Sequence, residues 1–411
     1  MFASVIISAS AAKKLESGYP WIFERDIFSR RFDMAGIVAM QDKRGRFMGQ
    51  AFYSPKSKIA LRFITKSKAA LDKEFWRKRI LASFDRRTVR EVSDAFRVIY
   101  AESDGIPSVV IDKYNDIFAI QTTSAGAETI KSELIDIIAE EFRPAAIIEK
   151  NNVEVRKLEG LQMIERIVYG DKTTTIVHEG SQKFEADILH GQKTGAYLDY
   201  RAFRLKAREL VRNSASLRAP QGRGNLLNAI EDGKLFCCTR NDMRALDLFC
   251  YQGWLSCHIA GKADKVIAVD ASKEAIKAAK RNTELNEHAN IEFICKDVFD
   301  FLSCCNEKFD FIHVDPPPFA KGRVDLPSAI KGYGKLIKAS IKLLKSGGIL
   351  FASSCSHHIS ENLLEKMVCG AAAEADAKCD IIYRGIQDKD HPVLKGFPES
   401  LYLKAIAVKV D

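Results

Sequence analysis

The feature that most constrains the fold is an alternation of apolar, strand-length runs with helical patterns between residues 245 and 358. The five apolar runs lie at 246–249, 266–269, 291–295, 309–314 and 349–354. Helical patterns fill most of the intervals, as at 273–286 and 330–344. This order predicts an α/β fold, a parallel sheet with helices on both faces. Because ligands of such sheets bind beyond the carboxyl ends of the strands, side chains at those ends should meet in one site.

The first three strand ends each carry an aspartate: Asp247, Asp270 and Asp297. The first turn, DLFCYQG, holds one glycine rather than the G-x-G-x-x-G pattern, which disfavours an NAD-dependent oxidoreductase. A carboxylate there suits the ammonium group of S-adenosylmethionine, with the backbone of Phe249 and Gly253 beside it. Asp270 can accept the ribose hydroxyls, and Asp297 can accept the adenine amino group. Each carboxylate alone is about as well explained as a structural cap, but three at successive strand ends favour a ligand site.

The fourth strand ends in the turn Asp315-Pro316-Pro317-Pro318-Phe319. Its prolines predict a rigid, extended turn that holds Asp315 at the mouth of the site. Asp315 can there meet the Watson–Crick edge of a base, while Pro316 and Phe319 line or stack on that base. Similar turns occur in methyltransferases that act on exocyclic nitrogens, so the motif predicts a base as substrate without selecting the target atom.

The fifth strand ends at Cys355, and a thiol at this position indicates nucleophilic catalysis. Pyrimidine C5 is a poor nucleophile, but thiolate attack at C6 creates an adduct whose C5 can accept a methyl group. An inert, buried thiol is the alternative for any single cysteine, and it is the interpretation for the other nine. All ten cysteines lie at or after Cys237 and none forms a C-x-x-C pair, so we expect reduced thiols, no metal site and a cytoplasmic protein. No apolar run approaches the length of a membrane span.

The N-terminal part carries the excess of positive charge. Residues 1–90 contain 20 lysines and arginines against 8 acidic residues, whereas the remaining residues contain 43 against 46. This distribution favours a polyanion-binding region, with a merely solvated basic surface as the alternative. Short apolar runs predict a β-rich module at 1–68, and strands around a helix at 128–141 predict an α+β unit within 69–180. Residues 181–411 complete the chain as the predicted catalytic domain, with an exposed insertion at 205–244.

These motifs resemble the large-subunit ribosomal RNA methyltransferase I family. The resemblance rests on DLFCYQG, VDAS, KDVFDFL, DPPPFAK, SSCSHH and DHPVLKGFPESLYLK, and it extends upstream to GQKTGAYLDYR, ESDGIPSVVIDKY and GYPWIFERDI. It implies a PUA domain, a middle EEHEE domain and a class I, Rossmann-like methyltransferase domain. It further implies S-adenosylmethionine as the cofactor, with Gln192 and Thr194 supporting Asp247, Asp270 and Asp297.

The same resemblance implies a cytosine-C5 methyltransferase of ribosomal RNA, in which Cys355 is the nucleophile and Asp315 orients the cytosine. A guanine-N RNA methyltransferase is the nearest alternative, and it would need no thiol. A non-catalytic RNA-binding assembly factor is the alternative of a different class, and absence of cofactor binding would support it. The target nucleotide, the base that removes the C5 proton and a homodimeric state are left open by the sequence.

Overall fold

The chain passes between two units, each with its own core. The computed structural model describes residues 4–30, 33–217, 242–319 and 322–411. Unit 1 consists of Met1–Arg201 together with Gln387–Leu401, and unit 2 consists of Ala202–Ile386 together with Tyr402–Asp411. Unit 1 therefore includes 181–201 and 387–401, two segments that the motif pattern grouped with the catalytic domain.

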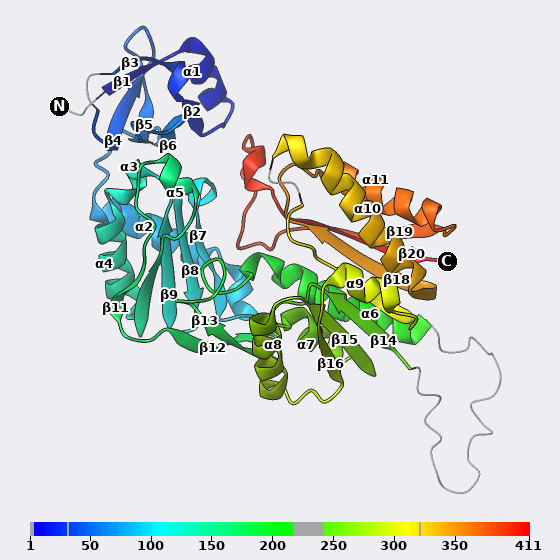
Figure 1. Ribbon diagram of the computed structural model, residues 1–411. Coiled ribbons are helices and arrows are strands. Elements are labelled where there is room, and N and C mark those ends of the chain that lie inside the picture. The colour runs from blue at the N-terminus through cyan, green and yellow to red at the C-terminus, as the bar shows by residue number, and fades with distance from the viewer. Residues whose placement is uncertain (1–3, 31–32, 218–241, 320–321) are drawn as a thin grey trace, which may run out of the picture. The chain divides into compact units, whose positions relative to one another are not determined.

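Unit 1 begins with a six-stranded sheet in the order β2-β6-β5-β4-β1-β3 (Figure 1). Its strands are β1 (Ser4–Ile7), β2 (Trp21–Phe23), β3 (Ile27–Arg30), β4 (Gly36–Gln41), β5 (Phe47–Tyr53) and β6 (Ile59–Thr65). Helix α1 (Ala9–Glu16) starts where the Ser8 hydroxyl accepts a hydrogen bond from the amide of Ala11. Alternating apolar side chains such as Val5, Ile7 and Leu61 are buried and form a small core.

The second part of unit 1 is a five-stranded sheet in the order β11-β10-β9-β8-β7. Its strands are β7 (Ala95–Tyr100), β8 (Val109–Tyr114), β9 (Ile117–Thr122), β10 (Ala146–Lys150) and β11 (Glu165–Gly170). The helices are α2 (Lys73–Asp85), α3 (Ala125–Glu128), α4 (Lys131–Phe142) and α5 (Val155–Leu158), and a hairpin of β12 (Thr174–Glu179) and β13 (Gln182–Asp187) follows. Trp76 is fully buried in the core of this part.

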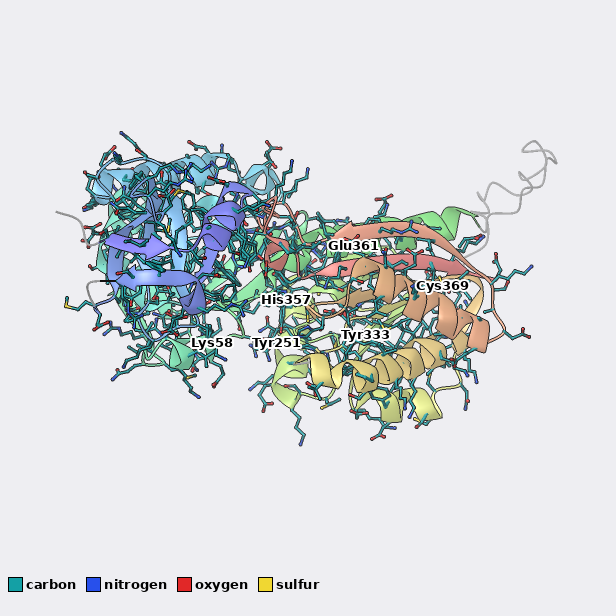
Figure 2. All side chains as sticks on the ribbon, turned by 90° about the horizontal axis from the view of Figure 1, so that it is seen from above. Lys58, Tyr251, Tyr333, His357, Glu361 and Cys369 are labelled. Carbon is teal, nitrogen blue, oxygen red and sulfur yellow. The ribbon has the colours of Figure 1, made fainter. Side chains whose placement is uncertain are left out.

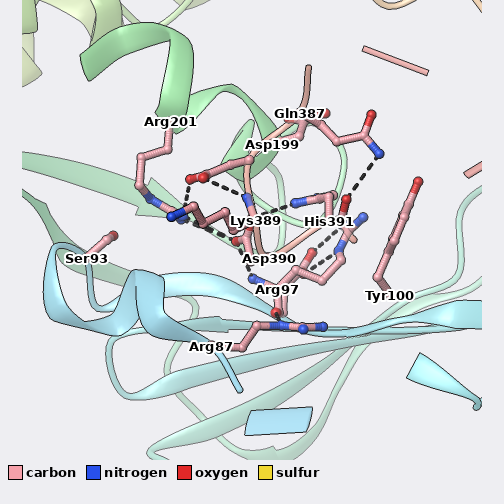
Figure 3. A network of polar contacts seen from close by, with 12 residues as sticks. Arg87, Ser93, Arg97, Tyr100, Asp199, Arg201, Gln387, Lys389, Asp390 and His391 are labelled. Carbon is pink, nitrogen blue, oxygen red and sulfur yellow. Dashed lines mark hydrogen bonds and ion pairs between the residues drawn. The ribbon is translucent and has the colours of Figure 1, made fainter. Parts of the chain in front are cut away.

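The returning segment 387–401 is fixed to unit 1 by buried ionic contacts (Figure 3). Arg201 has a fully buried side chain whose guanidinium nitrogen Nη1 lies 2.7 Å from Asp388 Oδ2 and 3.4 Å from Asp390 Oδ2. Asp390 Oδ2 also accepts a hydrogen bond of 2.9 Å from the backbone amide of Arg97 in β7. Arg97 and Asp390 are 293 positions apart in the sequence, and Arg201 and Asp388 are 187 apart.

Unit 2 contains a seven-stranded sheet in the order β16-β15-β14-β17-β18-β20-β19. Its strands are β14 (Arg244–Leu248), β15 (Lys265–Asp270), β16 (Ile291–Cys295), β17 (Phe309–Val314), β18 (Leu344–Ser354), β19 (Cys379–Ile386) and β20 (Lys404–Val410). The first five are parallel, while β20 runs antiparallel between β18 and β19. From β14 the chain adds β15 and β16 on one side of the sheet, and it then continues on the other side with β17 and β18. The boundary between β14 and β17 is therefore the switch point where ligands bind in such sheets.

Helices cover both faces of this sheet, as the alternating pattern predicted. Helices α9 (Val298–Cys304), α10 (Leu326–Lys342) and α11 (Glu361–Glu374) contribute to one large core with the central strands. Helix α8 (Lys273–Leu285) packs through Ile276 in a separate cluster on β15, close to α7 (Trp254–Ala260). The Ser272 hydroxyl caps α8 at the amide of Ala275, as expected from the sequence.

The stretch 205–244 is only partly described. Residues 205–217 belong to helix α6 (Arg201–Leu217), in which Ala207, Leu210 and Val211 are buried. Residues 205–211 thus pack through one apolar face, whereas the composition of this stretch had suggested an exposed insertion. The rest of the predicted insertion, 218–241, lies outside the described residues, and β14 starts at Arg244.

Within residues 4–30, 33–217, 242–319 and 322–411, no helix is both long and apolar enough to cross a membrane. In the same ranges, no group of three or more histidine, cysteine or acidic side chains is arranged to hold a metal ion.

Candidate active site

Asp247, at the end of β14, is fully buried and held by two protein groups. Its Oδ2 accepts a hydrogen bond of 2.5 Å from the Ser256 hydroxyl, and its Oδ1 lies 2.8 Å from Nδ1 of His313 in β17. The carboxylate thus ties together β14, β17 and the start of α7. Its contact with a ligand ammonium group stays a prediction, because the described contacts are internal.

The turn after β14 has a strained backbone. Phe249, Tyr251 and Gly253 all have positive φ angles, of 63°, 47° and 72°. A Cβ atom at position 253 would stand 2.9 Å from the Cβ of Ala279 in α8, so only glycine fits there without displacement. Strained backbone of this kind persists where surrounding contacts enforce it, and it is often found at binding sites.

Asp270 and Asp297 lie at the ends of the neighbouring strands β15 and β16. Asp270 accepts hydrogen bonds from the backbone amides of Tyr251 and Ser272, both at 2.9 Å. The bond from Tyr251 holds the turn after β14 against the end of β15. Asp297 caps helix α9, since its Oδ1 accepts the amides of Phe299 and Asp300. Asp297 is therefore a helix cap, the structural alternative, and Asp270 also has a structural role in its turn.

Both carboxylates nevertheless keep acceptor capacity for a ligand. A carboxylate oxygen has two lone pairs, so Asp270 can accept further donors at each oxygen. Asp297 is exposed, and its Oδ2 has no hydrogen-bond donor among the residues that the structure describes. Acceptors at two adjacent strand ends match the ribose hydroxyls and adenine amino group of S-adenosylmethionine, so the residues present fit that cofactor.

Asp315 and Phe319 frame the mouth of the site after β17. The Asp315 carboxylate is partly exposed and accepts a hydrogen bond from the Ser353 hydroxyl of β18. Pro316 is buried, which fixes the start of the turn. Phe319 packs edge-on against Tyr333 of α10, with ring centroids 5.0 Å apart, and Figure 2 labels Tyr333 in this unit. One edge of the Phe319 ring is thus already used in protein packing.

Cys355 follows the last residue of β18 and is partly exposed. Strands β17 and β18 pair in parallel with Val314 opposite Ala352, so Asp315 and Cys355 leave the sheet at the same edge. On the other side of β18, Ser354 pairs with Lys404 of β20. The ammonium group of Lys404 is buried and donates a hydrogen bond of 2.6 Å to the carbonyl oxygen of Ser356.

Gln192 and Thr194 belong to unit 1, and the structure describes them there. Thr194 is buried, and its hydroxyl lies 3.0 Å from the Tyr114 hydroxyl and 2.5 Å from Asp112 Oδ2. The Gln192 side-chain carbonyl accepts a hydrogen bond of 2.6 Å from Tyr197. Their predicted contact with the cofactor stays a prediction.

Two parts of the chain match families of known proteins. A family described as methyltransferase domain matches residues 239–396, and a family described as PUA-like domain matches residues 5–66. The ribosomal RNA large subunit methyltransferase I of Aliivibrio fischeri is 32% identical over 424 residues and covers 100% of both chains. The protein of the same name from Vibrio vulnificus is 33% identical over 425 residues, with the same coverage.

This chain belongs to the ribosomal RNA large subunit methyltransferase I family. The predicted family is confirmed, and so is the fold class of a PUA-like domain followed by a Rossmann-like methyltransferase domain. A solved protein from Streptococcus mutans, described as a SAM-dependent methyltransferase, has the same fold, with a TM-score of 0.77, 22% identity, and coverage of 99% of this chain and 100% of that one. Another solved methyltransferase, in complex with SAH, gives a TM-score of 0.78 at 21% identity, covering 99% and 100% of the two chains.

Three side chains of this methyltransferase site were not predicted from the sequence. They are His313, which contacts Asp247, Ser353, which contacts Asp315, and Lys404, which bonds the turn after Cys355. His313 and Ser353 lie inside apolar strand runs, where a polar residue facing the ligand edge was a usable signal. Lys404 gave no such signal, because only the pairing of β20 with β18 brings it to the site.

Proposed function

We propose that this protein forms 5-methylcytosine in large-subunit ribosomal RNA, with Cys355 as the nucleophile. Its cofactor is S-adenosylmethionine, as predicted, and Asp247, Phe249, Gly253, Asp270 and Asp297 are the residues proposed to surround it, with Gln192 and Thr194. The proposal rests mainly on one observation. A partly exposed thiol and a partly exposed carboxylate, Cys355 and Asp315, leave adjacent strands at the ligand edge of the sheet.

The chemistry follows from these two groups. The Cys355 thiolate adds to C6 of cytosine, a sulfur–carbon bond forms, and the electrons of the C5–C6 double bond become available at C5. When bound, S-adenosylmethionine supplies the methyl group that C5 accepts. A base then takes the C5 proton, the double bond re-forms, and the thiolate leaves. Asp315 can accept a hydrogen bond from the N4 amino group of cytosine and so hold the ring with C6 facing the thiol.

The substrate proposal draws on charge and on the N-terminal domain. Residues 1–90 carry most of the positive charge, which suits binding to the phosphates of RNA. The PUA-like domain and the similarity to ribosomal RNA large subunit methyltransferases support the same substrate class, ribosomal RNA. A homodimer stays a prediction.

A trapping assay tests the proposal. The protein is mixed with S-adenosylmethionine and large-subunit ribosomal RNA containing 5-fluorocytosine, whose C5 carries no proton for the base to remove. We expect an adduct between protein and RNA that survives denaturant, because the thiolate cannot leave.

Cys355→Ala should form no adduct and lose methyl transfer by at least about 10³-fold. Cys369→Ala, which removes another partly exposed thiol on α11, is the matched control and should behave like the native protein. Methyl transfer to RNA without any adduct would refute the C5 chemistry and favour a guanine nitrogen. Absence of both adduct and cofactor binding would favour a non-catalytic RNA-binding protein.

A further inference from the structure

We propose that Lys404 is a positioning residue for Cys355: its ammonium group fixes the turn that carries the thiol and stabilises the thiolate form. The inference deepens the proposed function, since it rests on Cys355 acting as a nucleophile. Lys404 lies 49 positions further along the chain, at the first residue of β20.

The first support is the register of the sheet. Strand β20 runs antiparallel to β18, and Lys404 pairs with Ser354, the residue immediately before Cys355. Nζ of Lys404 donates a hydrogen bond of 2.6 Å to the carbonyl oxygen of Ser356, one residue after Cys355. The lysine therefore contacts the main chain on both sides of the thiol, which defines the path of the turn.

The second support is that Lys404 is buried with no carboxylate beside it. Lys404 is 3% exposed, and among the described residues no acidic side chain lies within ion-pair distance of its Nζ. A buried ammonium group is costly unless it is paired or hydrogen-bonded. One backbone carbonyl satisfies one of its three donors, so a neighbouring anion would lower the cost further.

The third support is the electrostatic surroundings of the thiol. Cys355 and Glu361, at the start of α11, are the groups whose negative charge acts on Lys404, and Figure 2 labels Glu361. Burial lowers the pKa of Lys404 to about 8, while Cys355 and then Glu361 raise it. The lysine is accordingly charged at neutral pH.

Other titratable groups around the thiol do not supply a positive charge in the same way. Asp315 and Tyr333 both interact with this corner, and Cys355 and Asp315 each add to the rise in the Tyr333 pKa that burial mainly causes. A carboxylate near a thiol opposes its ionisation. His357, which packs against Tyr402 with ring centroids 5.7 Å apart, is exposed. Lys404 is buried and bonded to this turn, and its charge is opposite to that of Asp315.

The test measures ionisation of the thiol without RNA or cofactor. The full-length protein is alkylated with iodoacetamide at pH values from 5.5 to about 10, and modification of Cys355 is followed by mass spectrometry of its peptide. In the native protein we expect Cys355 to react as a thiol with a pKa below the ordinary value of about 8.5. In Lys404→Met the midpoint of the pH dependence of Cys355 alkylation should rise by about one pH unit, so that alkylation at pH 7 slows roughly tenfold.

Two further variants make the result specific. Lys404→Arg keeps a positive charge and should retain the low midpoint if it folds, and Lys409→Met removes a less buried lysine of the same strand as a matched control. An ordinary or raised Cys355 midpoint in the native protein would overturn the proposal even if Lys404→Met does not fold. An unchanged alkylation profile in a folded Lys404→Met protein would also overturn it. A lowered midpoint in a protein that forms no RNA adduct would instead leave the thiolate argument intact and refute the C5 reaction.

Discussion

Two clusters of buried charge in this protein are built in opposite ways. In unit 1, Arg201 is surrounded by Asp388, Asp390 and Glu179, so its charge is fully compensated. In unit 2, Lys404 is buried beside a partly exposed thiol and has no carboxylate within ion-pair distance in the described part of the chain.

The pKa shifts express the same difference. Burial alone would raise the pKa of Asp390, but His391 and Arg201 lower it well below its usual range. For Asp388, burial outweighs the effect of Arg201 and raises the pKa, so Asp390 is the more firmly ionised partner. The unit 1 cluster therefore holds the chain together through a closed set of charges, whereas the cluster around Cys355 still has a position for an anion. The paired charges of unit 1 are consistent with a structural role, whereas a buried ionisable group beside a partly exposed thiol at a strand end is a candidate for a functional one.

Removing the central cation of the closed cluster should have the largest effect on folding. Arg201→Met removes the guanidinium group that faces the buried carboxylates of Asp388, Asp390 and Glu179, and we expect the free energy of unfolding to fall by about 3–5 kcal/mol. Urea unfolding followed by circular dichroism measures this change. Arg46→Met is the control, because Arg46 is an exposed arginine whose ion pairs with Asp42 and Glu16 lie at the surface and should contribute little to stability. Equal losses in both variants would remove the distinction between the clusters.

A substitution near Cys355 in unit 2 should change activity more than stability. Asp315→Asn retains an oxygen that can accept a hydrogen bond from Ser353 but loses the charge that we propose meets the N4 amino group of cytosine. We expect kcat/KM for methyl transfer to fall by roughly 10–100-fold, equivalent to about 1–3 kcal/mol. The free energy of unfolding should change by less than about 0.5 kcal/mol. Asp300→Asn, in the first turn of α9, is the control. A large loss of stability with normal kcat/KM would mean that Asp315 is structural.

A smaller effect is expected from a partly exposed ion cluster of unit 1. Burial alone would raise the pKa of Glu128, but Arg156, Lys131 and Thr122 lower it from 4.5 to about 2. Because the folded pKa lies below the unfolded one, the stabilisation is complete above about pH 4.5 and is lost as the pH falls toward 2.

Glu128→Gln should therefore lower the Tm at pH 7 and bring the native and variant proteins closer together near pH 3. Thermal unfolding at both pH values measures the difference, and Glu91→Gln, at an exposed position, provides the baseline. A Tm difference that is the same at both pH values would show that the charge of Glu128 is not the cause.

The comparison also separates what local pattern determines from what pairing of distant segments decides. The alternation of apolar runs and helical patterns was sufficient to predict the parallel sheet, because strand and helix periods are properties of short stretches. The same reasoning placed Asp247, Asp270, Asp297, Asp315 and Cys355 at one edge, since parallel strands all end on the same side. Their positions at strand ends are as predicted, while their contacts with ligand stay predictions.

The sequence by itself determined the family, the α/β sheet and the acidic and thiol groups at its ligand edge, because each is encoded within a short motif. Only the tertiary structure decided that Asp247 is enclosed by Ser256 and His313, that 387–401 returns to unit 1, and that Lys404 lies beside the turn of Cys355. These contacts depend on the register of β20 against β18 and on a buried ion network between remote segments. A local pattern cannot specify them, because the free energy of each contact comes from desolvation and pairing that exist only once the distant partners are packed together.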